Sequence, residues 1–106
     1  MVTIETFREL ALSHPDAVEQ PHFEKTSFRI KKKIFATLST YDMRACLKLS
    51  EIDQSVFCTL DKSIVYPVDN KWGKMGWTMF TLEKVGEEMM SEALEKAYQH
   101  TLKKKK

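Results

Sequence analysis

The feature that most constrains the fold of this 106-residue chain is a pair of short segments in which hydrophobic and polar residues alternate. These segments are "KIFATLS" (residues 33–39) and "RACLKLS" (residues 44–50), and only "TYDM" separates them. Because side chains alternate between the two faces of a β-strand, each segment can bury one face and expose the other. The short connection predicts an antiparallel hairpin that packs one of its faces on a core.

The alternation also predicts which side chains share a face. In the first segment we expect Ile34, Ala36 and Leu38 on one side, with Phe35 and Thr37 on the other. Four more strands are predicted outside this hairpin. "AVEQPHF" contains Pro21, which indicates an edge strand or a bulge. "SFRI" (residues 27–30) alternates, "SIVYPVD" (residues 63–69) is a brief extended piece, and "GWTMFTL" (residues 76–82) enters its strand through Gly76.

Three segments have the spacing of amphipathic helices. The first follows Thr3, which can cap it, and the last covers about residues 86–102. We expect the last helix to be bound to the sheet by Met90, Leu94 and Ala97.

The middle helix begins after Ser50, with Asp53 completing a capping pattern. Its apolar residues are expected to form one stripe that packs on the core, and they are Ile52, Val56, Phe57 and Leu60.

These elements predict an α+β fold with a mainly antiparallel β-sheet and helices packed on one face, in the order α-β-β-β-β-α-β-β-α. The length is that of one domain, which we place at residues 1–102, followed by a lysine tail at residues 103–106. The chain has no apolar run of the roughly 18 residues needed to span a membrane, and no secretory signal. We therefore expect a cytoplasmic, monomeric protein that does not enter membranes.

The charge is unevenly distributed along the chain. The formal net charge is +2, and without the four lysines at the end it falls by four to −2. Binding of nucleic acid through bulk positive charge is therefore not expected. Residues 22–48 hold seven Lys or Arg against two acids, whereas residues 83–95 hold five Glu against one Lys. One basic and one acidic region are therefore expected.

The sequence carries no motif of a metal site or of nucleophilic catalysis. His14, His22 and His100 lie far apart, and Cys46 and Cys58 fit neither CxxC nor a zinc module. There is no GxSxG motif and no glycine-rich phosphate loop. We expect a protein without catalytic activity, without metal or other cofactor, and with both cysteines as free thiols.

A basic segment, "FRIKKKIF", is the first candidate for binding. It contains Arg29, Lys31, Lys32 and Lys33, and Lys48 follows on the next predicted strand. A hairpin with lysines at its tip can contact phosphates as a wing does. The same lysines can instead keep the hairpin soluble and block edge-to-edge pairing. The sequence leaves both interpretations open.

The second candidate is "KWGKMGW" (residues 71–77), in which Trp72 and Trp77 flank two glycines. With Lys71 and Lys74 it could form a stacking platform beside cations, as in proteins that bind single strands. The alternative is that the tryptophans anchor an irregular loop to the core. We expect Trp77 to be a core residue, and the sequence leaves Trp72 open between the two roles.

The order of several phrases resembles the MmcQ/YjbR family of small bacterial proteins. The phrases are "HPDAVEQPHFEKTSFRIKKKIFATLS", "RACLKLS", "VYPVDNKWGKMGWTMFTLEKV" and "EALEKAYQH", which together cover most of residues 11–100. The resemblance implies a CyaY-like (frataxin-like) α+β fold and a proposed double-wing DNA-binding surface. Members of the family often have glycine in the hairpin turn where this chain has Lys32.

From these observations we expect a small binding module for DNA that contacts the phosphate backbone weakly. The expected contacts are the basic hairpin and the Trp loop, that is Arg29, Lys31, Lys32, Lys33, Lys48, Lys71, Trp72 and Lys74. The alternative is a module for a protein or a small ligand, with a pocket lined by the Trp loop. The two differ in whether the lysines of the hairpin and of the Trp loop lie on one face.

Overall fold

The structure is a computed structural model that describes residues 1–22 and 25–103. Its elements are α1 (Ile4–Leu12), β1 (Val18–His22), β2 (Lys25–Ile30), β3 (Lys33–Ser39), β4 (Arg44–Lys48), α2 (Glu51–Leu60), β5 (Val65–Pro67), α3 (Lys71–Lys74), β6 (Trp77–Thr81) and α4 (Glu87–Lys103). The predicted order is confirmed, with α3 as an additional single turn. Residues 104–106 of the predicted lysine tail lie outside the described residues.

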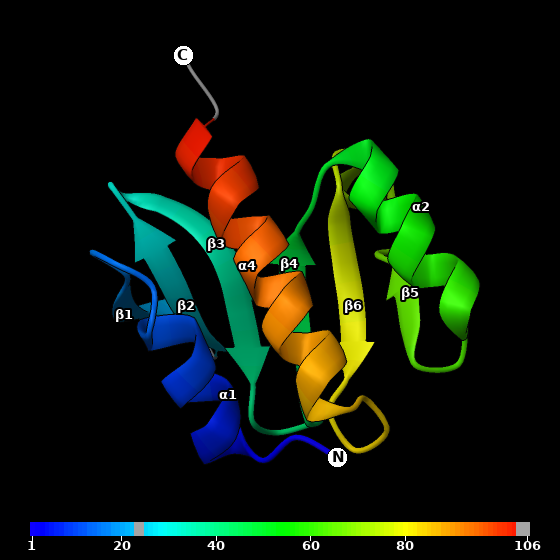
Figure 1. The fold of residues 1–106 in the computed structure, drawn as a ribbon, viewed down its shortest axis with the longest axis horizontal. Coiled ribbons are helices and arrows are strands. Elements are labelled where there is room, and N and C mark those ends of the chain that lie inside the picture. Colours follow the sequence, from blue (N-terminus) through cyan, green and yellow to red (C-terminus); the bar gives the residue numbers. More distant parts are fainter. Residues whose placement is uncertain (23–24, 104–106) are drawn as a thin grey trace.

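The strands form one six-stranded sheet in the order β1-β2-β3-β4-β6-β5, and every neighbouring pair is antiparallel. Figure 1 shows α1, α4 and α2 lying over the same face of this sheet. The predicted α+β class is therefore confirmed, and β1, which contains Pro21, is an edge strand as predicted. Within the described residues, the helices are too short or too polar to cross a bilayer.

Side-chain caps define where two helices begin. The Thr3 hydroxyl accepts a hydrogen bond of 3.0 Å from the backbone N–H of Thr6 at the start of α1. The Ser50 hydroxyl accepts one of 3.1 Å from the N–H of Asp53 at the start of α2. Each cap satisfies a donor that has no partner inside its helix, so both predicted starts are confirmed.

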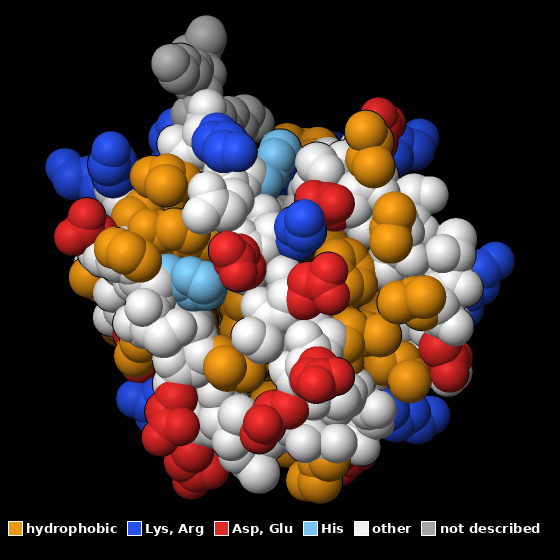
Figure 2. All heavy atoms as spheres, viewed as in Figure 1, with side chains coloured by type: hydrophobic (Ala, Val, Ile, Leu, Met, Phe, Trp, Pro, Cys, Tyr) orange, Lys and Arg blue, Asp and Glu red, His pale blue; other side chains and the backbone are white. Residues whose placement is uncertain are grey.

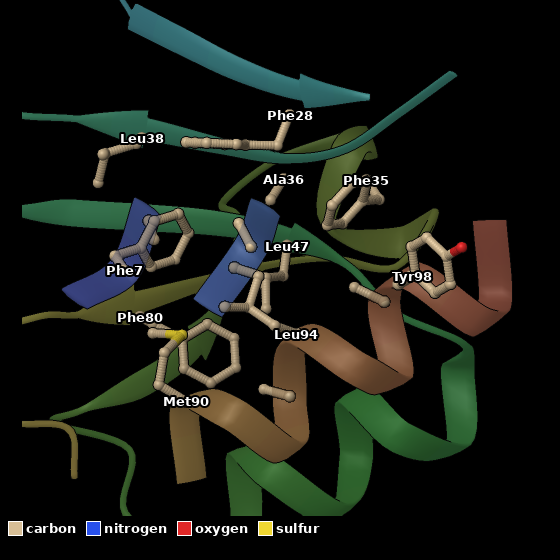
Figure 3. Close-up of a cluster of buried hydrophobic side chains, with 14 of the residues drawn as sticks. Phe7, Phe28, Phe35, Ala36, Leu38, Leu47, Phe80, Met90, Leu94 and Tyr98 are labelled. Carbon is tan, nitrogen blue, oxygen red and sulfur yellow. The ribbon is translucent and has the colours of Figure 1, made fainter. Parts of the chain in front are cut away.

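The core lies between the sheet and helices α1 and α4. Figure 3 shows side chains of the covered face of the sheet, among them Phe28, Leu38, Leu47 and Phe80. Phe28 packs edge-to-face on Phe7 of α1, with ring centroids 5.5 Å apart. Met90, Leu94, Ala97 and Tyr98 of α4 and Phe7 of α1 close over them, and all of these side chains are buried. The predicted attachment of the last helix to the sheet is confirmed.

One prediction about β3 is wrong. Ile34 was expected to share a face with Ala36 and Leu38, and Phe35 to lie on the other, but Phe35 is fully buried with Ala36 and Leu38, and Ile34 is only partly buried. The cause is a β-bulge: Phe28 pairs with Ala36 while Arg29 pairs with Ile34, so Phe35 is an extra residue. A bulge places two residues opposite one and reverses the alternation before it. Phe35 therefore packs edge-to-face on Tyr98, with ring centroids 5.7 Å apart.

The predicted stripe of α2 is also wrong. Phe57 is buried, but Ile52, Val56 and Leu60 are 75%, 53% and 59% exposed. These three residues lie one turn apart along one line of the helix, and Phe57 is rotated from that line by about 100°. Because α2 sits over the short edge strand β5, only its Phe57 side meets the sheet. The outer line of the helix stays in solvent.

The first prediction concerns the attachment of α4. Leu94→Ala should lower the free energy of unfolding by about 2–5 kcal/mol, because it removes a fully buried side chain and leaves a cavity. Leu102→Ala is the matched control on the same helix, because Leu102 is 38% exposed, and it should cost at most about 1 kcal/mol. Denaturant unfolding of both variants measures this. Equal losses would contradict the described packing.

Candidate nucleic-acid interface

The candidate site lies on the side of the sheet opposite α1, α2 and α4, which we call the open face (Figure 1). Its side chains alternate along the strands with the buried core residues. One row across the sheet joins directly paired residues, and it runs Ser27, Thr37, Cys46, Met79, Tyr66. The next row pairs Arg29 with Ile34 and Lys48 with Trp77.

Two hollows meet on this face. The first, which we call the Trp hollow, has a volume of about 410 Å³ and a mainly apolar lining, composed of Lys25, Ile34, Thr37, Cys46, Val68, Trp72, Trp77 and Met79. Trp72 is 48% exposed and Trp77 is partly buried. A planar, partly apolar group could therefore lie against these rings.

The second hollow, which we call the basic groove, has a volume of about 500 Å³ at the end of the sheet where the β2–β3 hairpin meets the last turns of α4. The described residues that line it include four Lys or Arg side chains and no acid. The full lining is Arg29, Lys32, Lys33, Ile34, Lys48, Trp77, His100 and Thr101. Ile34 and Trp77 also line the Trp hollow, so the two hollows are adjacent. An anionic group in the groove could be joined to a flat group in the Trp hollow.

Each tryptophan carries a lysine close to its ring. Lys48 Nζ lies 5.7 Å from the ring centroid of Trp77, and Lys71 Nζ lies 5.9 Å from that of Trp72. At these distances the ammonium group is attracted to the ring face. Arg29 is held in place as well, because its Nε donates a 2.9 Å hydrogen bond to Ser27 Oγ.

The tip of the basic hairpin is a two-residue turn under backbone strain. Ile30 pairs with Lys33, and the two residues between them, Lys31 and Lys32, have φ values of 52° and 70°. A tight hairpin requires positive φ at both positions, which glycine or asparagine adopts more easily than lysine. The turn therefore places two lysines in a backbone conformation that is unfavourable for them.

The two glycines explain how the Trp loop is built. A Cβ on Gly73 would collide with the carbonyl oxygen of Val68, and one on Gly76 would collide with that of Leu49. Gly76 also has a φ of 106°, which side-chain-bearing residues rarely adopt. Asn70 begins the turn of α3 by accepting a 2.8 Å hydrogen bond from the N–H of Trp72. The close backbone packing holds the loop, and it leaves the side chain of Trp72 48% exposed.

Gln54 of α2 links the helix layer to the Trp loop. Its Nε2 lies 2.9 Å from the carbonyl oxygen of Gly73, 3.2 Å from that of Trp77 and 3.1 Å from Oγ1 of Thr78. The amide thereby holds both ends of the segment that carries the two tryptophans. This role of Gln54 could not be predicted from the sequence, since a glutamine in a helix carries no signal for a partner 19 to 24 residues away.

Cys46 lies at the Trp hollow, and Cys58 lies on α2; both are free thiols. Burial raises the pKa of Cys46 to about 11, with Lys25 opposing the shift. A thiol with this pKa is protonated at neutral pH and is a poor nucleophile. In the described part of the chain, no three His, Cys, Asp or Glu side chains come together as metal ligands would.

The structure brings together half of the residues singled out in the sequence. Arg29, Lys32, Lys33 and Lys48 converge on the basic groove. Trp72 lines the Trp hollow, with Lys71 beside its ring.

The remaining two lysines lie elsewhere. Lys31 is exposed at the hairpin tip and does not line the groove. Lys74, with Lys71, lines a separate hollow of about 710 Å³ that also contains Glu51 and Asp69. Phosphate contact by each of these cations stays a prediction.

Other residues of the face were missed. Trp77 was expected in the core, but it lies partly buried on the open face because it alternates with the buried Thr78 and Phe80. Lys25 and Met79 line the Trp hollow, and His100 reaches the basic groove from α4. The strand register, read from the sequence, could have placed Trp77 and Met79, whereas His100 comes from a distant element.

The fold and its open face define a small α+β domain with a basic groove beside an aromatic hollow. The sequence matches the family model described as YjbR over residues 12–100, and the chain belongs to that family. Its fold is similar to that in the crystal structure of Deinococcus radiodurans protein DR2400, whose domain is described as DUF419. The TM-score is 0.85 at 22% identity, covering 98% of this chain and 81% of that one. No curated protein matches the sequence.

The second prediction tests how the Trp loop is held. Gln54→Ala should lower the free energy of unfolding by about 1 kcal/mol, because it removes the hydrogen bonds from α2 to the Trp loop, while the carbonyl groups of Gly73 and Trp77 keep their backbone donors. Tryptophan emission should also shift to longer wavelength as the loop loosens. Ser55→Ala, at the exposed neighbouring position, should change stability by no more than about 0.5 kcal/mol. Unchanged melting and emission for Gln54→Ala would show that the loop is held by other contacts.

Proposed function

We propose that this protein binds single-stranded nucleic acid through the open face of its sheet. The observation that carries the proposal is that the basic groove and the Trp hollow meet at Ile34 and Trp77. A nucleotide combines the same two chemistries, an anionic phosphate and a flat base, at neighbouring positions. The phosphates would lie in the groove and a base in the hollow.

The phosphate contacts would come from the cations of the basic groove. Three of these cations come from the β2–β3 hairpin and one from the next strand, β4. They are Arg29, Lys32 and Lys33 of the hairpin and Lys48 of β4. Such contacts depend on charge and not on base sequence, so binding would be weak, non-specific and sensitive to salt. This interpretation of the hairpin lysines is favoured over a role in solubility alone, since they converge on one hollow.

Base contacts would come from the rings. Aromatic side chains stack on any base, which makes them suited to binding that tolerates every sequence. The exposed ring of Trp72 and the partly buried ring of Trp77 line the same hollow. In a duplex the bases are paired and stacked inside, so only a single strand can present a base to this hollow. The geometry therefore favours single strands over duplex DNA.

In this proposal the protein is a cytoplasmic, monomeric binding module without catalytic activity. The protonated thiol of Cys46 argues against a thiolate nucleophile at the Trp hollow. The alternative function is binding of a small ligand or a protein at the Trp loop. Such a ligand would use the Trp hollow without the basic groove, and loss of groove cations would leave its affinity unchanged.

The third prediction tests the proposal with a fluorescent oligothymidine of about 12 nucleotides, a length that spans one binding face. Four phosphate contacts give an expected slope of log affinity against log salt of about −3. Lys32→Gly should weaken binding and flatten this slope by about 0.7, while relieving the positive φ and stabilising the fold by about 1 kcal/mol. Trp72→Ala should weaken binding by about 1–3 kcal/mol and leave the slope unchanged.

Two controls accompany these variants. Lys62→Gly removes the same charge from an exposed turn after α2 and should leave the affinity unchanged. A chain that ends at residue 103 removes lysines that could bind phosphate by themselves. If this truncation alone abolishes binding, the tail and not the open face is responsible. Equal affinity for a duplex of the same length would contradict insertion of a base.

A further inference from the structure

The outer face of α2 is uncharged and apolar, although it lies in solvent. Ile52, Val56 and Leu60 follow one another at four-residue spacing and are 75%, 53% and 59% exposed. The residues beside this stripe are Ser55 and Thr59, which are also exposed. Both charged residues of α2, Glu51 and Asp53, lie in its first turn.

A helix whose outer face is exposed to solvent normally carries charged residues on that face. Three aligned aliphatic side chains with small hydroxyl residues beside them are instead typical of a surface that packs against another helix. In the described part of the chain, no element covers this stripe. Figure 2 shows hydrophobic side chains gathered over α2 on the helix-covered side of the molecule.

The neighbouring helix α4 supplies negative charge along this stripe. Its segment 87–96 contains Glu87, Glu88, Glu92 and Glu95 against Lys96 alone. A groove of about 520 Å³ separates the two helices, and Asp53 of α2 lines it together with Glu92 of α4. Lys96 and Lys103 line the same groove, so the negative side lies toward the first half of α4. Acidic side chains over α4 stand beside the apolar ones over α2 in Figure 2.

We propose that the face formed by Ile52, Val56 and Leu60 is a docking site for an amphipathic helix of another protein. The apolar stripe of that helix would pack on α2. Its Lys or Arg residues on one side would pair with Glu88 and Glu92. Charge complementarity sets the partner's character, since a helix with acidic flanks would face the acids of α4.

The site is independent of the proposed function. The stripe of α2 lies on the helix-covered side of the sheet, whereas the Trp hollow lies on the open face and the basic groove lies at the end of the sheet, beside the β2–β3 hairpin. None of the three stripe residues lines either hollow. A bound strand and a bound helix would therefore not compete. Val56→Lys should weaken helix docking and leave oligonucleotide affinity unchanged, so failure of one proposal does not entail failure of the other.

The test uses two synthetic helical peptides of about 18 residues, enough for about five turns. They share one leucine stripe and differ in the flanking positions, which are lysine in one peptide and glutamate in the other. Calorimetry should show binding of the lysine peptide, and affinity for the glutamate peptide at least about tenfold lower. Val56→Lys should lower the affinity for the lysine peptide at least about tenfold, and Glu92→Lys should reduce the preference between the peptides.

Tyr41→Lys is the matched control, because Tyr41 is 98% exposed at the β3–β4 turn, away from α2. It should leave the lysine peptide's affinity unchanged. Ile52→Lys replaces Val56→Lys if the latter lowers the melting temperature, since Ile52 is the most exposed residue of the stripe. The proposal is overturned if neither lysine substitution weakens peptide binding. It is also overturned if the wild-type chain is a dimer in sedimentation and Val56→Lys makes it a monomer.

Discussion

The packing of α4 across the central strands is the interaction on which the rest of the structure depends. Leu94 and its neighbours on α4 bury one face of β3 and β4, and this fixes which side chains face the helices. Because strand side chains alternate, the same contact fixes the other face. Since Leu47 and Phe80 lie in the core, the residues next to them in β4 and β6 lie on the open face. These residues include Cys46, Lys48 and Met79, and Trp77 lies on the same face. Fold and candidate site are thus two consequences of one register.

Much of this arrangement could be predicted from the sequence, since it depends on local patterns. The caps at Thr3 and Ser50, the edge position of Pro21 and the buried face of α4 follow from residue type and periodicity. The failures have a different origin. The bulge at Phe35 and the exposure of Val56 depend on pairing and on the neighbours of α2, which periodicity does not contain.

The site shows the same division. The cations of the hairpin were predicted from their spacing, and the structure gathers Lys32, Lys33 and Lys48 around one groove. Gln54 could not be predicted to hold the Trp loop, because its acceptors are brought near only by the complete fold. The molecule has two chemically distinct sides, with cations and aromatic rings on the open face and an acidic, apolar surface over α2 and α4.

The most direct measurement of the central claim is the alkylation rate of Cys46, with and without a bound oligonucleotide. Cys46 lies at the Trp hollow, and Cys58 on α2 is a control within the same molecule. The pKa of both thiols is raised by burial, so alkylation by iodoacetamide is slow and can be followed by mass spectrometry. We predict that a saturating single strand slows modification of Cys46 and not of Cys58, and that a duplex of equal length protects neither. Unchanged reactivity of Cys46 at saturation would contradict binding of a base in the Trp hollow.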